Sequence, residues 1–157
     1  MKASFAAIAL SLGAALAAPS TESIKRQQDS HPVSVSSISL RRLDEGNRIV
    51  FLSSITRHDK SGAPLESTNC QTQWNPEVPA GPENPVQCAD PAFNFYFPNG
   101  VKSLENYDIV VNGPDGKSSG TIEKGPRYQC GPYDGTIAGI EYECKITQGA
   151  EFFLTLE

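Results

Sequence analysis

The chain has 157 residues, of which 38% are hydrophobic and 20% are charged, and its 18 Asp and Glu against 13 Lys and Arg give a net charge of −5. This length fits a single domain. An acidic surface repels the phosphate backbone of nucleic acids and anionic lipid headgroups, so we expect neither nucleic acid nor membrane among the partners.

Residues 1–17 are typical of a signal peptide. Lys2 supplies the positive charge, the run from Phe5 to Leu16 is apolar and rich in alanine, and Ala15-Leu16-Ala17 fits the small-x-small cleavage rule. The apolar run is too short to span a bilayer, and no later stretch approaches the roughly 20 apolar residues that a membrane helix needs. We therefore expect a secreted, extracellular protein.

Residues 18–26 form a polar stretch that we interpret as a propeptide or a disordered leader. Lys25-Arg26 is a dibasic pair, and a kexin-type protease would cut after it and leave Gln27 as the new N-terminus. The alternative is an uncut, solvated charge pair. In either case the folded domain is expected over residues 27–157.

The first part of this domain is typical of a β-hairpin. Val33 and Val35 alternate in one register and Ile38 and Leu40 in the other, so we expect a bulge or bend at Ser36-Ser37. A turn at residues 44–47 then leads into a second strand over 48–56, antiparallel to the first.

Further short strands and turns fill the rest of the chain. Alternating Phe93, Phe95 and Phe97 give the clearest strand, whereas residues 75–85 hold four prolines and predict an irregular loop. The other expected strands lie at 66–73, 107–111, 121–122, 127–130, 140–146 and 151–156. Nine to eleven strands favour an all-β fold, a compact antiparallel barrel or sandwich, with a small α+β fold as the alternative.

Four cysteines carry the clearest chemical signal: Cys70, Cys88, Cys130 and Cys144. They allow three disulfide connectivities, among which sequence alone does not choose. Two local bridges would each close a loop of roughly 15 residues and stabilise the fold by about 3 kcal/mol in the chain-entropy model. Zinc is disfavoured because the chain has no CxxC motif and its two histidines lie far from the cysteines in sequence. We expect no metal and no cofactor.

Three candidate catalytic sets are each outweighed by a structural interpretation. His58-Asp59 could form a base with an orienting carboxylate, but neighbours on a strand face opposite ways, so a solvated turn is expected. His31 should lie in a mobile N-terminal region. Glu141 and Glu143 could hydrolyse a glycoside only across a cleft, and as neighbours on one strand they are expected to form an outward polar face.

The third set combines Arg127, Tyr128 and Tyr133 with Glu141, as in small secreted ribonucleases. The acidic surface argues against an RNA substrate, so we expect no enzyme. Trp74 opens the proline-rich loop and is the candidate partner contact, because tryptophan is a favoured interface anchor. The alternative is that Trp74 folds back to cap the barrel.

Taken in order, several motifs resemble the fungal family of the Alternaria major allergen. The resemblance covers roughly residues 31–156. It rests on the alanine-rich leader ending in Ala-Pro, VSVSSISLRRLDEG before a strand, the two cysteine pairs, FNFYF after the second cysteine, and the ending GAEFFLTL. It implies a compact antiparallel β-barrel in which Cys70 pairs with Cys88 and Cys130 with Cys144, and to which no enzymatic activity is firmly attached.

Members of that family are allergens and secreted effectors or elicitors recognised by plants. The resemblance therefore implies binding of a host protein or small ligand in the cell wall or plant apoplast, with loops 57–65, 75–87 and 112–119 as expected contact regions. Some members dimerise through an additional cysteine near the mature N-terminus. This chain has Ser30 and His31 there, which leaves a monomer or a non-covalent dimer. The alternatives are a small secreted hydrolase with a cryptic carboxylate site and a structural cell-wall protein.

Overall fold

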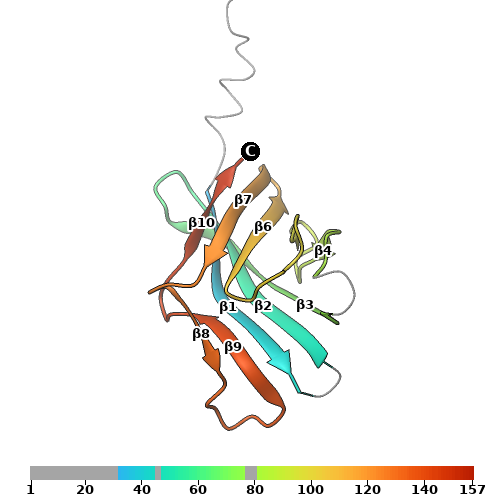
Figure 1. Ribbon diagram of the computed structural model, residues 1–157. Helices are drawn as coiled ribbons and strands as arrows, with labels where there is room; N and C mark the ends of the chain where they lie inside the picture. Colours follow the sequence, from blue (N-terminus) through green and yellow to red (C-terminus); the bar gives the residue numbers. More distant parts are fainter. Residues whose placement is uncertain (1–31, 45–46, 77–80) are drawn as a thin grey trace, which may run out of the picture.

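The computed structural model describes residues 32–44, 47–76 and 81–157, so the predicted leader segments 1–17 and 18–26 lie outside the described residues. Ten strands follow one another, with no α-helix in the described ranges (Figure 1). They are β1 (Val33–Leu43), β2 (Arg48–His58), β3 (Pro64–Trp74), β4 (Val86–Gln87), β5 (Asn94–Tyr96), β6 (Asn106–Gly113), β7 (Gly116–Glu123), β8 (Tyr128–Pro132), β9 (Ile140–Ile146) and β10 (Phe152–Leu156). No helix long and apolar enough to cross a membrane occurs in this part of the chain.

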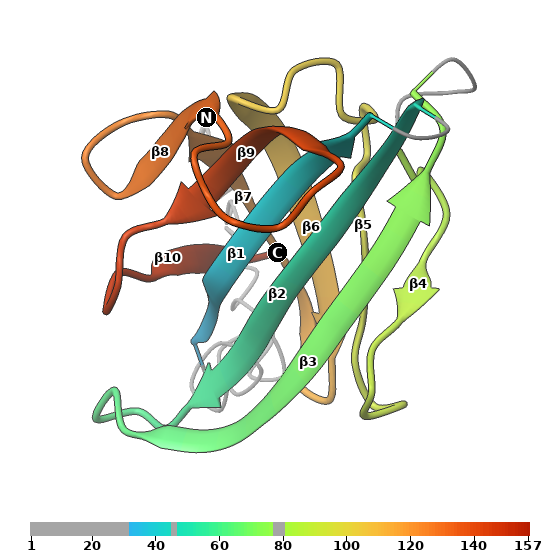
Figure 2. The ribbon, with the colours of Figure 1, turned by 90° about the horizontal axis from the view of Figure 1, so that it is seen from below.

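Eight of the strands form a nearly closed antiparallel barrel. The sheet order is β3-β2-β1-β10-β7-β6-β5-β4, and Figure 2 shows how it curls until β3 and β4, its two ends, face each other. The predicted all-β fold is confirmed, as is the antiparallel barrel.

The bulge predicted at Ser36-Ser37 is confirmed, and it divides β1 between two partners. The pairing of β1 with β2 shifts register between Ser36 and Ser39, and Ser37 has φ of 51°. Before the bulge, residues 33–35 pair with β10, and after it residues 39–43 pair with β9. Among the described strands, the β8–β9 hairpin therefore pairs with the barrel through β1 (Figure 1).

Aromatic side chains fill the barrel interior. Phe93, Phe95 and Phe97 are all fully buried, which confirms that their alternation marks a core-facing segment. The ring of Phe51 from β2 lies 5.2 Å from the rings of both Phe95 and Phe97, and Tyr107 from β6 contacts Phe97 edge-on at 5.4 Å. Such edge-to-face packing stabilises beyond the area it buries.

β7 is longer than the predicted strand at residues 121–122. Its first half carries lysine, serine and glycine and shows no apolar alternation that sequence reasoning could detect. The turn after Gly113 nevertheless folds it against the whole of β6, with eight paired positions from Asn106↔Glu123 to Gly113↔Gly116. Pairing with a neighbouring strand, rather than intrinsic preference, makes this segment a strand.

The two disulfides join Cys70 to Cys88 and Cys130 to Cys144, the connectivity that the family resemblance implies. The second links directly opposed residues of β8 and β9. The first links β3 to the residue that follows β4, and beside it the Ala89 N–H donates to the Asn69 carbonyl at 2.8 Å. Cys70–Cys88 therefore closes the seam between the two ends of the sheet.

Candidate functional site

Two of the three predicted contact loops meet at one end of the barrel. Arg57, where loop 57–65 begins, has its Nε 2.9 Å from the Asp115 carboxylate in loop 112–119, and its Nη1 donates to Glu66 at 3.2 Å. Loop 75–87 connects β3 to β4 instead, and its residues 77–80 lie outside the described residues. The three loops thus do not form one continuous surface.

Two large hydrophobic side chains are exposed at this end. Phe153 of β10 is 61% exposed and Leu65 of β3 is 51% exposed. The Phe153 ring lies 5.3 Å from the ring of His58, and Leu65 stands between the β3 residues that pair with Arg57 and His58. We call this end of the barrel the Arg57 end; Arg57 and Asp115 lie at its mouth, whereas Leu65 and Phe153 lie on the outer face of the sheet.

His58 is buried, so the predicted solvated turn is wrong. β2 continues through His58, whose side chain is enclosed by residues from other elements. Its Nε2 lies 2.8 Å from the Ser34 hydroxyl and 3.6 Å from the Glu151 carboxylate, and its Nδ1 lies 3.1 Å from the Gly62 carbonyl. Ser34 is itself fully buried, so this serine–histidine contact offers no nucleophile to a substrate.

Asp59, the predicted orienting carboxylate, serves the β2–β3 turn. It accepts hydrogen bonds from the Ser61 hydroxyl and the Ala63 N–H, and these bonds lower the pKa of its carboxyl group. The other histidine, His31, lies outside the described residues.

Glu141 is exposed, as expected for an outward polar face, whereas Glu143 is partly buried because it is paired with cations. Arg41 of β1 is its register partner and donates from Nε at 2.7 Å, while the Lys145 ammonium lies 3.5 Å from its second carboxylate oxygen. Burial of Glu143 opposes ionisation, but the Arg41 hydrogen bond and the two positive charges outweigh it and lower its pKa. A glycosidase acid needs a raised pKa instead.

The ribonuclease-like set does not converge. Tyr128 is fully buried, its hydroxyl donates to the Leu104 carbonyl at 3.0 Å, and burial raises its pKa. Arg127 lies on the surface with its guanidinium 5.1 Å from the centre of the Phe152 ring. Tyr133 meets Glu141 through a backbone hydrogen bond.

Trp74, the predicted partner contact, is half-buried at the end of β3. Its ring packs 5.8 Å from that of Phe97, and its buried indole N–H has no hydrogen-bond partner among the described residues. This packing favours the capping interpretation, and contact of Trp74 with a partner stays a prediction.

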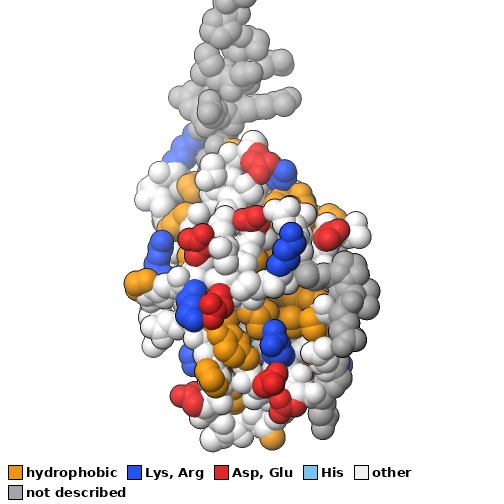
Figure 3. Space-filling model, viewed as in Figure 1, with side chains coloured by type: hydrophobic (Ala, Val, Ile, Leu, Met, Phe, Trp, Pro, Cys, Tyr) orange, Lys and Arg blue, Asp and Glu red, His pale blue; other side chains and the backbone are white. Residues whose placement is uncertain are grey.

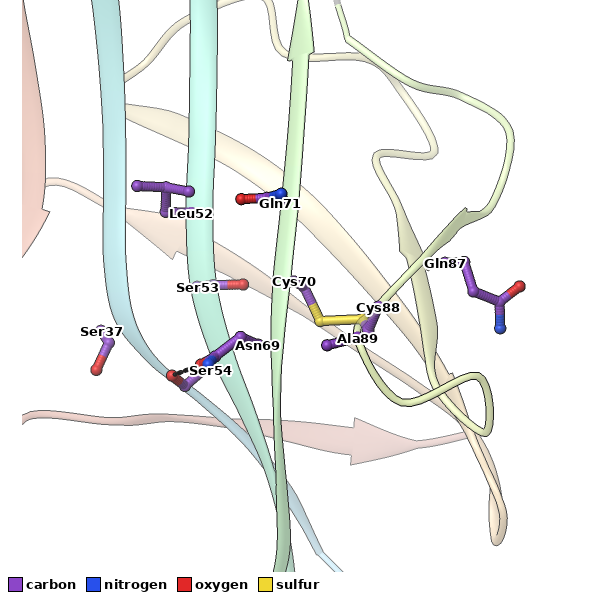
Figure 4. Close-up of a pocket in the computed structure, with 10 residues that line it drawn as sticks. All are labelled: Ser37, Leu52, Ser53, Ser54, Asn69, Cys70, Gln71, Gln87, Cys88 and Ala89. Carbon is purple, nitrogen blue, oxygen red and sulfur yellow. Dashed lines mark hydrogen bonds between the residues drawn. A yellow bond between two sulfur atoms is a disulfide. The ribbon is translucent and has the colours of Figure 1, made fainter.

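A hollow of about 560 Å³ lies on the β1–β4 side of the barrel, over the Cys70–Cys88 seam (Figure 4). It crosses β1, β2 and β3 and continues across the seam to residues 87–89. Its lining consists of uncharged residues: Ser37, Leu52, Ser53, Ser54, Asn69, Cys70, Gln71, Gln87, Cys88 and Ala89. Asn69 and Gln71 are exposed while Cys70 between them is buried, so the amides face outward and the sulfur faces the core.

Sequence reasoning missed this hollow. The available signal was the run of hydroxyl and amide side chains at alternate positions of β2 and β3, from Ser54 and Thr56 to Asn69, Gln71 and Gln73. Two hydrogen bonds tie this outer face together, Ser54 to Asn69 and Thr56 to Ser67, each at 2.9 Å. That pattern was used only to place strands.

On the opposite face, basic and acidic side chains alternate. Figure 3 shows them interspersed over β6, β7 and β10, without an extended area of one sign among the described residues in view. Within the described ranges, no group of three or more His, Cys, Asp or Glu is placed to hold a metal ion.

Comparison of the chain with protein-family models, curated proteins and solved structures found no match.

Proposed function

We propose that the protein is secreted and acts by binding a host extracellular protein, in the manner of a fungal effector, elicitor or allergen. The observation that carries this proposal is the Arg57 end, where an ion pair joins two loops of the expected contact region and two large hydrophobic side chains are exposed on the outer face of the sheet. Large exposed apolar groups with a polar rim are typical of protein interaction surfaces.

A binding role is supported over catalysis by what the candidate catalytic groups contact. Glu143 is paired with Arg41 and Lys145, His58 is enclosed with Ser34, and Tyr128 donates to a backbone carbonyl inside the core. Each group is occupied by a partner within the fold.

Secretion is supported by the predicted signal peptide and by the two disulfides, which persist in oxidising compartments. Kinship with the Alternaria major allergen family rests on the sequence motifs and is part of the proposal. The plant apoplast is the compartment that this kinship suggests.

The expected partner presents an apolar pocket to the Arg57 end. The Arg57–Asp115 ion pair, with 2.9 Å between Nε and the carboxylate, connects the two loops before binding, and such a connection reduces the entropy lost on association. Phe153 and Leu65 are the expected anchors.

The test replaces Phe153 and Leu65 by serine, singly and together, and measures the plant cell-death response to the purified protein. We expect the double variant to need at least about tenfold more protein, because buried aromatic anchors contribute 2 kcal/mol or more to interfaces. Ile137→Ser is the matched control: Ile137 is 55% exposed but lies in the β8–β9 connection, at the other end of the molecule (Figure 1).

Equal responses from the control and the double variant would contradict the Arg57 end as the contact surface. A hydrolase would instead show turnover in a substrate panel. A measurable turnover that disappears in Glu143→Gln or Glu141→Gln would contradict the binding role itself.

A further inference from the structure

We infer that the hollow across β1–β4 binds a neutral oligosaccharide. This site lies on a different surface from the Arg57 end and goes beyond the proposed function. It rests on that function in one respect, that the protein binds its ligand without cleaving it.

The direction of the hollow favours a ligand that lies across the strands. Its lining comes from the β1 bulge at Ser37, from residues 52–54 of β2, from 69–71 of β3 and from 87–89 after β4. Neighbouring strands are about 4.8 Å apart, so β1 to β3 span about 10 Å, and residues 87–89 continue the lining across the seam. A peptide that added to the β3 edge would run along the strand instead. In OB-fold barrels a sheet face binds oligosaccharides.

The chemistry of the lining matches a sugar chain. Hydroxyl and amide groups both donate and accept hydrogen bonds, as sugar hydroxyls do. Leu52 supplies an apolar contact for the C–H faces of the rings. Because none of the described residues that line the hollow is charged and the whole chain carries a net charge of −5, a neutral polymer fits better than an anionic one.

Existing hydrogen bonds orient the amides at both rims. The Ser54 hydroxyl donates to Oδ1 of Asn69, which leaves the Asn69 amide hydrogens as donors toward a ligand. The Gln87 amide donates to the Pro91 carbonyl, which holds that side chain at the outer edge of the hollow. Figure 4 shows Ser54 and Asn69 meeting over β2, and the Gln87 side chain pointing away from them beyond the disulfide.

The Cys70–Cys88 disulfide holds the two rims at a fixed spacing. Its Cα atoms are 4.3 Å apart, and the Ala89 N–H to Asn69 carbonyl bond lies next to it. The site is therefore formed before the ligand arrives. Since no aromatic ring lines it, we expect a modest dissociation constant, on the order of 0.1–1 mM.

The test is an amide NMR titration of the full secreted protein with soluble oligosaccharides. The neutral probes are chitin, β-1,3-glucan, cellulose and xylan fragments, and an oligogalacturonate is the anionic comparison. We expect at least one neutral probe to shift the amide signals of residues 52–54, 69–71 and 87–89, and the oligogalacturonate to shift none of them.

Variants locate the binding. Gln71→Glu places a charge in the hollow, and Gln73→Glu places the same charge two residues further along the same exposed face, outside it. We expect Gln71→Glu and Asn69→Ala to weaken binding at least about fivefold, the value of one hydrogen bond, and Gln73→Glu to leave it unchanged.

Absence of shifts with every neutral probe at about 10 mM would overturn the inference, given the expected affinity. So would equal effects of Gln71→Glu and Gln73→Glu, or shifts produced only by an extended peptide. These outcomes leave the proposed function standing, because Phe153 and Leu65 are tested separately. Cleavage of the sugar during the titration would instead contradict the proposed binding role.

Discussion

Ser37 has an unfavourable backbone conformation at the point where β1 changes its partner strand. Its φ of 51° lies in the left-handed region, and its position marks the point where β1 leaves β10 and begins to pair with β9. Left-handed backbone costs an L-residue roughly 1–2 kcal/mol. The rest of the barrel must therefore hold this conformation in place.

Substitutions at Ser37 should change the free energy of unfolding according to how well the new residue tolerates a positive φ. We expect Ser37→Val to lower the free energy of unfolding by about 1–2 kcal/mol, since a β-branched side chain tolerates positive φ least, and Ser37→Gly to raise it slightly or leave it unchanged. Urea unfolding measures both. Thr155→Val, at an exposed β10 position where β-branched residues are favoured, is the control and should be neutral. A Ser37→Val protein as stable as the control would refute the assigned strain.

The Arg41–Glu143 pair should show in the pH dependence of stability. The Glu143 side chain is only 9% exposed, so Arg41→Met should cost about 1–2 kcal/mol near pH 7 by removing its main partner. Because the pKa of Glu143 is lowered in the folded protein, its contribution is present above the ordinary value of 4.5 and is lost as pH falls through the folded pKa.

The difference between wild type and Arg41→Met should therefore shrink towards pH 3 in chemical unfolding experiments. Lys145→Met is the matched control, because the Lys145 side chain is 61% exposed and 3.5 Å from Glu143, and such pairs contribute little. A difference that stays constant from pH 7 to pH 3 would show that the pair stabilises the fold in another way.

Among the structural elements, the two disulfides differ in what they connect: one joins paired strands, and the other joins the two unpaired ends of the sheet. Cys130–Cys144 connects β8 and β9, which share five paired positions. Cys70–Cys88 connects β3 and β4, which are not neighbours in the sheet ladder. The seam bridge therefore determines whether the sheet stays closed.

We expect replacement of Cys70 and Cys88 by alanine to cost about 3 kcal/mol and to remove the hydrogen-exchange protection of the Ala89 amide. Replacement of Cys130 and Cys144 should cost a similar amount in chain entropy, while the amides paired between β8 and β9 keep some protection. Unchanged protection of Ala89 in the first variant would mean that the seam closes without the disulfide.

Across the whole molecule, sequence reasoning succeeded where a signal is local. The alternation of Phe93, Phe95 and Phe97 identified a core segment, and the change of register at Ser36-Ser37 identified the bulge. The burial of His58 depends on Ser34 and Phe153, which lie 24 and 95 positions away in the sequence. The residues next to His58 therefore do not predict these contacts. The oligosaccharide hollow was missed for the same reason, since four separate segments must come together to form it.

The fold separates two surfaces that the account assigns to binding. The Arg57 end gathers the ends of β2 and β6 with β10, whereas the hollow lies where β1 to β4 meet over the seam. One molecule could therefore hold a sugar chain and a protein partner together. Both surfaces depend on a barrel whose seam is closed by the Cys70–Cys88 disulfide.

Peptide mapping of the exported protein under non-reducing conditions tests that dependence most directly. We expect fully oxidised protein with the bridges Cys70–Cys88 and Cys130–Cys144 and an N-terminus at Ala18 or Gln27. Free thiols, a different connectivity, or a chain that keeps its leader inside the cell would contradict the account.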